Sequence, residues 1–130
     1  MHPDLNVPAS VPDGMLDWMG MAHLLGEPDT LPELTAIGPR TPMLSPEDII
    51  FLGYEWSQMT GHEQERFTMR SYYGIPVSTK GLDPCAAEAA LTRLAERVDR
   101  ILIHFDVDVV DFLDTPLSEN DGRNVGLTLD

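Results

Sequence analysis

Three short apolar runs alternate with two helix-like segments, and this order constrains the fold more than any other feature of the chain. The runs are Ile49–Gly53, residues 74–79 and Ile101–Phe105. The polar residues 59–71 suit a helix, and Asp83-Pro84 is typical of a helix start. Strands that alternate with helices favour a parallel sheet with right-handed crossovers. We therefore predict an α/β fold with three layers, α/β/α, around a parallel sheet.

The first part of the chain is expected to consist mostly of loops. Prolines recur throughout residues 1–48 and interrupt regular structure. One short helix is predicted between Met15 and Leu25, and Gly26 should end it. The chain has 130 residues and no internal repeat, which suits one ordinary domain. We expect residues 1–130 to form a single domain.

The acidic composition limits the classes of partner. The net charge is −14, from 22 acidic and 8 basic residues. This charge repels phosphate backbones and anionic lipids, so we expect neither nucleic acid nor membrane as a partner. It favours metal ions and cationic organic substrates.

The single cysteine, Cys85, rules out an internal disulfide, and we expect it to be buried in a helix. No signal peptide or long apolar run is present, which predicts the cytoplasm.

Two carboxylates follow the third apolar run. Parallel sheets bind ligands beyond the C-terminal ends of their strands, where Asp106 and Asp108 are expected. If the chain stays extended there, side chains two apart point the same way, and a cation is needed to neutralise the pair. Hard ions such as Mn²⁺ or Mg²⁺ suit these ligands. The alternative is a strand that ends in an Asp-rich turn.

A second candidate cluster lies near the N-terminus. His2 and Asp4 are two residues apart, and Asn6 follows. In an extended segment the imidazole and the carboxylate would face one way. That combination suits Mn²⁺, Fe²⁺ or Zn²⁺. The alternative is a solvated histidine with no ligand role.

Together the two clusters resemble the arginase, agmatinase and formimidoylglutamase family. That family carries D-x-H-x-D-x-N after one strand and S-x-D-x-D-x-x-D-P after a later one. This chain has H-x-D-x-N from His2, "FDVDVVD" from Phe105, and then "TPLSENDGRNVGLT", which keeps the Pro116 and the Gly-Leu-Thr of Gly126–Thr128. The resemblance covers nearly all of this chain but only part of the family's length.

The resemblance implies a Mn²⁺-dependent hydrolase of guanidino or amidino C–N bonds with a three-layer α/β/α fold. Two Mn²⁺ ions would supply a hydroxide near neutral pH. The substrate would be a small cation, and the full-length protein would form a homo-oligomer. Asn6 would lie near the substrate, and Asp111 would support the turn instead of binding metal. The metal ligands implied are His2, Asp4, Asp106 and Asp108.

The chain departs from the family at several points. Met1 directly precedes His2, so an Asp ligand two residues earlier and a G-G-D-H histidine are missing. Asp17 occupies the position of a proton-shuttling His and could accept protons, cap a helix or bind a cationic substrate. Phe112 replaces the proline of D-P. We expect a fragment that is inactive as an isolated chain, and the residues do not identify a catalytic group.

Two other functions are compatible with parts of the sequence. A non-catalytic relative of the family could use the same sheet for binding. An apolar run that leads into D-x-D is also similar to the first motif of Mg²⁺-dependent haloacid-dehalogenase-type phosphatases. In such an enzyme Asp106 would be the nucleophile and Asp108 the general acid, but no lysine follows them in this chain.

Overall fold

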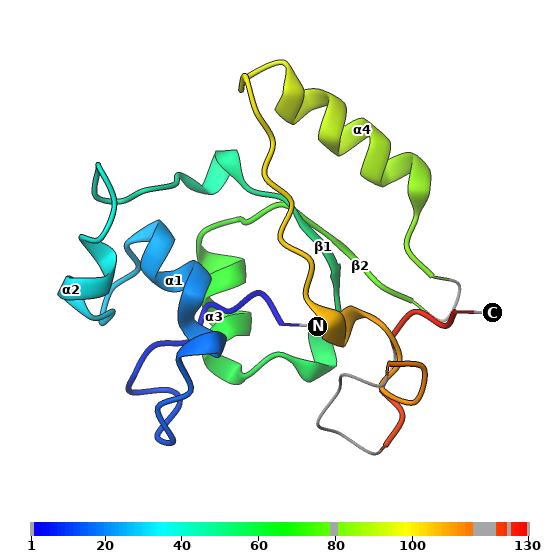
Figure 1. Cartoon of the computed structure of the whole chain (residues 1–130), viewed down its shortest axis with the longest axis horizontal. Coiled ribbons are helices and arrows are strands. Elements are labelled where there is room, and N and C mark those ends of the chain that lie inside the picture. The colour runs from blue at the N-terminus through cyan, green and yellow to red at the C-terminus, as the bar shows by residue number, and fades with distance from the viewer. Residues whose placement is uncertain (1, 79–80, 116–121, 125, 130) are drawn as a thin grey trace. The chain divides into compact units, whose positions relative to one another are not determined.

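The computed structural model describes residues 2–78, 81–115, 122–124 and 126–129. The chain forms two compact units (Figure 1). Unit 1 contains Ile50–Glu55 and Gly74–Asp130, and unit 2 contains His2–Ile49 and Trp56–Tyr73.

The sheet of unit 1 has two parallel strands. Strand β1 (Phe51–Tyr54) pairs with β2 (Gly74–Pro76), with Leu52 opposite Ile75. The N–H of Val77 extends the pairing by donating to the carbonyl of Tyr54 at 2.9 Å. The predicted α/β class with parallel strands is therefore confirmed.

Helix α4 (Pro84–Ala95) covers apolar side chains of unit 1, as its sequence predicts. The Asp83 carboxylate accepts hydrogen bonds from two amides of the first turn, at 3.0 and 3.1 Å. Ala87 and Ala90 pack in one cluster with Ile75 of β2. The expectation that Cys85 is buried is wrong, because Cys85 lies in the first turn on the exposed side of this helix.

Strand β1 contains an irregularity at Gly53. The register of the pair shifts between Leu52 and Tyr54, and Gly53 has a φ of +80°. A Cβ at this position would lie 2.6 Å from Cγ2 of Val109. Val109 belongs to the short 3-10 helix η4 (Val107–Val109). Glycine therefore permits both the backbone conformation and the close approach of η4 to the strand.

The predicted third strand, Ile101–Phe105, does not form. The side chains of Leu102 and Ile103 are 95% and 82% exposed. Among the residues that the structure describes, no backbone hydrogen bond involves residues 101–105. A strand needs a partner that completes its ladder of hydrogen bonds, and apolar composition alone does not supply one.

Unit 2 is mainly helical. The predicted helix near Met15–Leu25 is confirmed as a 3-10 turn that continues into an α-helix, and Gly26 ends it with a φ of +61°. The predicted helix within residues 59–71 is confirmed as α3. The elements of unit 2 are η1 (Leu16–Met19), α1 (Gly20–Leu25), α2 (Pro32–Thr35), η2 (Pro46–Asp48), η3 (Trp56–Gln58) and α3 (Gly61–Met69).

The apolar core of unit 2 combines its N-terminal segment with these helices. Its buried hydrophobic residues are Leu5, Val7, Val11, Met19, Ala22, Leu25, Met59, Phe67 and Tyr72. The rings of Phe67 and Tyr72 meet edge to face at 5.9 Å between centroids.

Within the described part of the chain, none of the helices is both long and apolar enough to span a membrane.

Gly53→Ala should lower the free energy of unfolding by about 1–2 kcal/mol, because alanine is strained at positive φ and its methyl group would press on Val109. Urea titration followed by circular dichroism measures the change. Gly61→Ala is the matched control, since nothing lies within 4 Å of its Cβ position. Equal effects of the two substitutions would contradict this account of Gly53.

Candidate metal centre

The segment with the first predicted ligands is fixed in unit 2 through its backbone. The amide of Ala22 in α1 donates to the carbonyl of Asp4 at 3.1 Å. The amide of Asn6 donates to the carbonyl of Trp18 at 3.2 Å. The side chains on either side of Leu5 therefore occupy defined positions beside η1 and α1, although this segment has no regular secondary structure.

A buried carboxylate on α3 holds the same segment from a second direction. Glu63 is fully buried, and its Oε1 accepts a hydrogen bond from the Leu5 amide at 3.3 Å. Its Oε2 accepts from the Thr60 amide at 2.9 Å, while the Thr60 hydroxyl accepts from the Glu63 amide at 3.2 Å. This capping box joins the start of α3 to the N-terminal segment. Burial raises the pKa of Glu63, and the amides of Thr60 and Leu5 oppose that rise.

Asp4 is not extended, contrary to the expectation for this segment. Its φ is +53°, in the left-handed region that aspartate tolerates better than most residues. Strand-like alternation therefore does not orient the side chains of His2 and Asp4. The His2 ring instead stacks on Trp18, with 5.6 Å between ring centroids. Both side chains are partly buried, and their role as ligands stays a prediction.

Asn6 lies inside unit 2, with 1% of its surface exposed. Its Oδ1 accepts hydrogen bonds from the Thr60 hydroxyl at 2.7 Å and from the Ser10 hydroxyl at 3.1 Å. The side chain thus links the N-terminal segment to the cap of α3. A role for Asn6 toward a substrate stays a prediction.

The second predicted pair lies in unit 1, at η4. Asp106 precedes this helix, and its Oδ1 accepts a hydrogen bond from the Asp108 amide at 3.3 Å. Asp108 lies within the 3-10 turn, so the extended geometry assumed for the pair ends at Asp106. The turn forms because the first carboxylate caps the amide two residues later. Coordination of a metal by these two carboxylates is still a prediction.

Asp111 supports the turn, as the family resemblance implies. It is 3% exposed, and its Oδ1 accepts a hydrogen bond from the Leu113 amide at 3.0 Å. Its Oδ2 forms an ion pair with Nη1 of Arg123 at 3.2 Å. Both carboxylate oxygens are therefore used to hold the loop that follows η4.

The Gly-Leu-Thr segment packs directly on this turn. The amide of Leu127 donates to the carbonyl of Val109, and the amide of Asp111 donates to the carbonyl of Leu127, each at 2.8 Å. A Cβ on Gly126 would lie 2.5 Å from backbone atoms of Val110 and Asp111. Only glycine leaves room for this contact.

Asn124 completes the frame around the acidic turn. Its Nδ2 donates to the carbonyl of Asp108 at 3.0 Å, and its Oδ1 accepts from the amides of Phe112 and Gly126 at 3.1 and 3.2 Å. One side chain thereby fixes the backbone of Asp108 and the segment after it. The sequence does not indicate this role of Asn124, because an asparagine in a polar loop carries no periodic signal.

The structure places the two halves of the predicted centre in different units. His2 and Asp4 belong to unit 2, and Asp106 and Asp108 belong to unit 1. Among the described residues, no three His, Cys, Asp or Glu side chains gather into a set that could hold a metal ion. The donor types do fit Mn²⁺, which accepts carboxylate oxygen and imidazole nitrogen. Each half supplies two such donors on a backbone fixed by hydrogen bonds.

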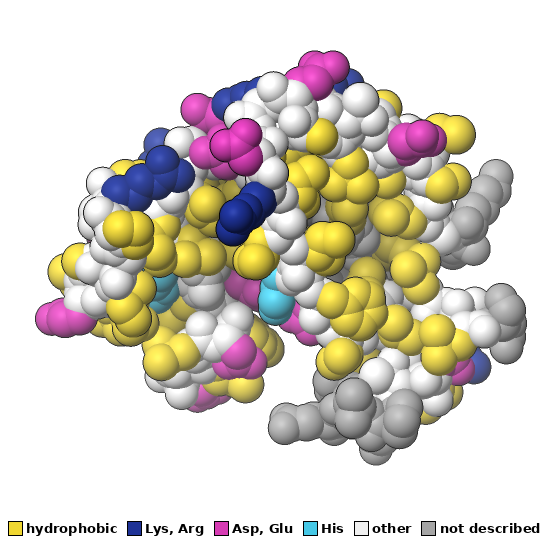
Figure 2. Space-filling model, turned by 45° about the horizontal axis from the view of Figure 1, so that its top comes forward, with side chains coloured by type: hydrophobic (Ala, Val, Ile, Leu, Met, Phe, Trp, Pro, Cys, Tyr) yellow, Lys and Arg dark blue, Asp and Glu magenta, His cyan; other side chains and the backbone are white. Residues whose placement is uncertain are grey.

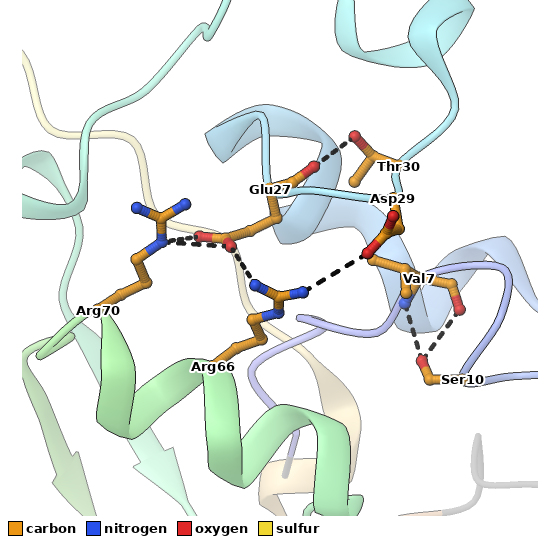
Figure 3. Close-up of polar contacts among 7 residues, drawn as sticks. All are labelled: Val7, Ser10, Glu27, Asp29, Thr30, Arg66 and Arg70. Carbon is orange, nitrogen blue, oxygen red and sulfur yellow. Dashed lines mark hydrogen bonds and ion pairs between the residues drawn. The ribbon is translucent and has the colours of Figure 1, made fainter.

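The sequence did not indicate the ion-pair cluster that surrounds the buried carboxylate of Glu27 in unit 2 (Figure 3). Glu27 is 3% exposed, and its carboxylate pairs with Arg70 Nε at 3.1 Å and with Arg66 Nη1 at 3.8 Å. Arg66 also reaches the carboxylate of Asp29 at 3.7 Å. The Tyr72 hydroxyl donates to Glu27, and the pKa of Tyr72 is raised by burial and by that carboxylate. The available signal was two arginines four residues apart, Arg66 within α3 and Arg70 at its C-cap.

His23 has a structural role. It is 6% exposed, its Nδ1 donates to the Met19 carbonyl at 2.7 Å, and its Nε2 accepts from the Leu31 amide at 3.1 Å. A carbonyl can only accept and an amide can only donate, so Nδ1 is the donor, Nε2 is the acceptor, and both nitrogens are occupied. Asp17 is exposed in the first turn of η1, whose N-cap residue is Met15. A helix-capping role for Asp17 is therefore wrong.

One similarity to a known protein agrees with the family that the paired motifs suggest. The chain is 29% identical over 117 residues to arginase-1 of Sus scrofa. The match covers 88% of this chain and 36% of that protein, so the chain spans about a third of the length of this curated relative. No protein-family model matches the chain, and no solved structure matches it.

Gly126→Ala should destabilise the chain by about 2 kcal/mol or more, because the added methyl group would overlap backbone atoms that cannot move independently. Thermal and urea unfolding measure the loss. Gly122→Ala is the control, since nothing lies within 4 Å of its Cβ position. A neutral Gly126→Ala variant would show that the turn does not depend on this close approach.

Glu63 should make stability depend on pH. Because burial raises its pKa above the ordinary value of 4.5, the folded state binds a proton more tightly than the unfolded state. This contribution is fully present below the unfolded pKa and is lost as the pH rises through the folded pKa. Glu63→Gln does not titrate, so its unfolding free energy relative to the wild type should increase across that window.

Urea titrations of both proteins at a series of pH values test this expectation. Glu65→Gln is the control on the same helix, because Glu65 is exposed, and it should leave the pH dependence as in the wild type. A constant difference between wild type and Glu63→Gln at all pH values would contradict it.

Proposed function

We propose that this chain is part of a Mn²⁺-dependent hydrolase of guanidino or amidino C–N bonds, related to the arginases. The observation that carries the proposal is the similarity to arginase-1 over 88% of the chain. Two motifs support it, H-x-D-x-N at His2 and D-x-D-x-x-D at Asp106. The substrate would be a small cation, which is compatible with the net charge of −14.

The residues proposed as ligands are His2, Asp4, Asp106 and Asp108. Mn²⁺, when bound, would polarise the substrate and lower the pKa of water. The chain's own contribution is to hold the donors. Glu63 and α1 fix the backbone around Asp4, and Asn124 and Gly126 fix the backbone around Asp108. Asn6 is proposed to lie near the substrate, supported by Thr60.

The residue at the family's proton-shuttle position is an exposed carboxylate, Asp17. A carboxylate has an ordinary pKa well below that of histidine, so it is a weaker base at neutral pH. It would instead attract a cationic substrate. In the arginases an asparagine helps to hold the substrate and a histidine helps to move protons, and Met15 and Asp17 replace them here. We therefore propose a substrate other than arginine, and we expect the isolated chain to show no turnover.

Mn²⁺ binding should be measurable but weak, because four donors are proposed where the family uses six. Isothermal titration calorimetry of the chain with MnCl₂ measures it. Asp106→Ala should abolish the binding, while Asp99→Ala, which removes an exposed carboxylate of the same unit, should leave it intact. Binding that survives Asp106→Ala would exclude the proposed centre.

A panel of guanidino and amidino compounds, assayed for urea and ammonia, completes the test. Turnover that requires Mn²⁺ would extend the proposal to the isolated chain. A wild-type chain that binds no Mn²⁺ would favour a non-catalytic relative. Release of phosphate from a small ester with Mg²⁺, lost in Asp106→Asn, would favour the phosphatase instead.

A further inference from the structure

The segment from Arg100 to Asp106 has the composition of a strand, but it pairs with no strand among the residues that the structure describes. Ile101–Phe105 contains no glycine or proline and consists mostly of residues that favour sheets. Leu102 is 95% exposed, Ile103 82% and Phe105 64%. Figure 1 shows the segment as plain coil after α4. An exposed apolar segment whose backbone is not paired in a sheet is, like an edge strand, a template for pairing with another chain.

Apolar side chains cover broad areas of the face drawn in Figure 2, between its charged groups. Exposed apolar areas of this kind on a protein indicate a contact surface. The charges that flank residues 101–105 indicate which partner would fit this segment. Arg100 lies at one end and Asp106 at the other, and both side chains are exposed.

The segment is complementary to itself. If two copies pair in antiparallel orientation with the two-fold axis at Ile103, Arg100 of each copy lies opposite Asp106 of the other. Ile101 then lies opposite Phe105, an aromatic–aliphatic pair of the kind that stabilises neighbouring strands. The contact is isologous, and the same patch serves both copies, as closed dimers require.

We propose that residues 100–106 pair with the same segment of a second copy of this chain. The ladder uses the amides and carbonyls of Ile101, Ile103 and Phe105, because alternate residues form the hydrogen-bonded pairs. The carbonyl of Asp106 stays with the Val109 amide, which it binds at 3.3 Å. The pairing therefore leaves η4 in place. The proposal does not rest on the proposed function, although both involve Asp106.

Analytical ultracentrifugation over a wide range of chain concentrations, with a chelator and about 0.15 M salt to screen the repulsion between acidic copies, tests the proposal. The wild type should associate to dimers. Ile103→Lys places two ammonium groups opposite each other on the axis and should raise the dimer dissociation constant about tenfold or more. Ile37→Lys is the matched control, because Ile37 is 74% exposed in unit 2.

A charge exchange tests the orientation of the pair. Arg100→Asp alone and Asp106→Arg alone each place like charges opposite each other, so each variant should dimerise more weakly than the wild type. A mixture of the two restores opposite charges at both positions and should form heterodimers. The substituted side chains are exposed, and circular dichroism of each variant checks that the fold is retained.

Cross-linking tests the register. In a Cys85→Ser background, Ile103→Cys should form an intermolecular disulfide, since opposed residues have Cα atoms about 5.5 Å apart. Ile101→Cys should not, because its counterpart would be about 13 Å away along the strands. A wild type that stays monomeric at every concentration, or an Ile103→Lys variant that associates like the wild type, would overturn the proposal.

Discussion

The buried carboxylate of Glu63 is the contact on which the arrangement of unit 2 most depends. It joins the start of α3 to the backbone of Leu5, which lies 58 residues earlier in the chain. A buried charge is costly, and backbone amides directed at both oxygens offset that cost. Because Leu5 lies between Asp4 and Asn6, the orientation of the first predicted motif follows from a side chain on a distant helix.

Close backbone approach plays the corresponding role in unit 1. Gly53 leaves room for Val109, and Gly126 leaves room for the backbone of Val110 and Asp111. The acidic turn thus contacts β1 at Gly53 and the Gly-Leu-Thr segment at Gly126. In unit 2 the contacts that fix the predicted ligands come from other residues. In unit 1 the glycine contacts act together with the cap that Asp106 provides for the Asp108 amide. The supporting contacts come from glycines, which leave room for the close approach, and from a buried glutamate whose oxygens accept hydrogen bonds from backbone amides.

Asp106 connects the two proposals made for this chain. It begins the acidic turn as a candidate ligand, and it ends the exposed segment as a candidate partner of Arg100 in a second copy. A carboxylate that neutralises Mn²⁺ is less available to a guanidinium, so metal binding and self-pairing should oppose each other. The two activities can therefore be distinguished, because one needs the metal and the other is measured in its absence.

The amino-acid sequence by itself determined the helices α3 and α4, the cap of α4 at Asp83 and the end of α1 at Gly26. These features depend on neighbouring residues, whose signals are periodicity and capping. The alternation of apolar runs with helices also indicated the parallel pair β1 and β2. Only the tertiary structure decided that residues 101–105 lack a ladder, that Asp4 is left-handed, and that Glu27 and Glu63 are buried. Each of those outcomes depends on contacts with residues that are distant in the sequence, and a local sequence pattern does not specify such contacts.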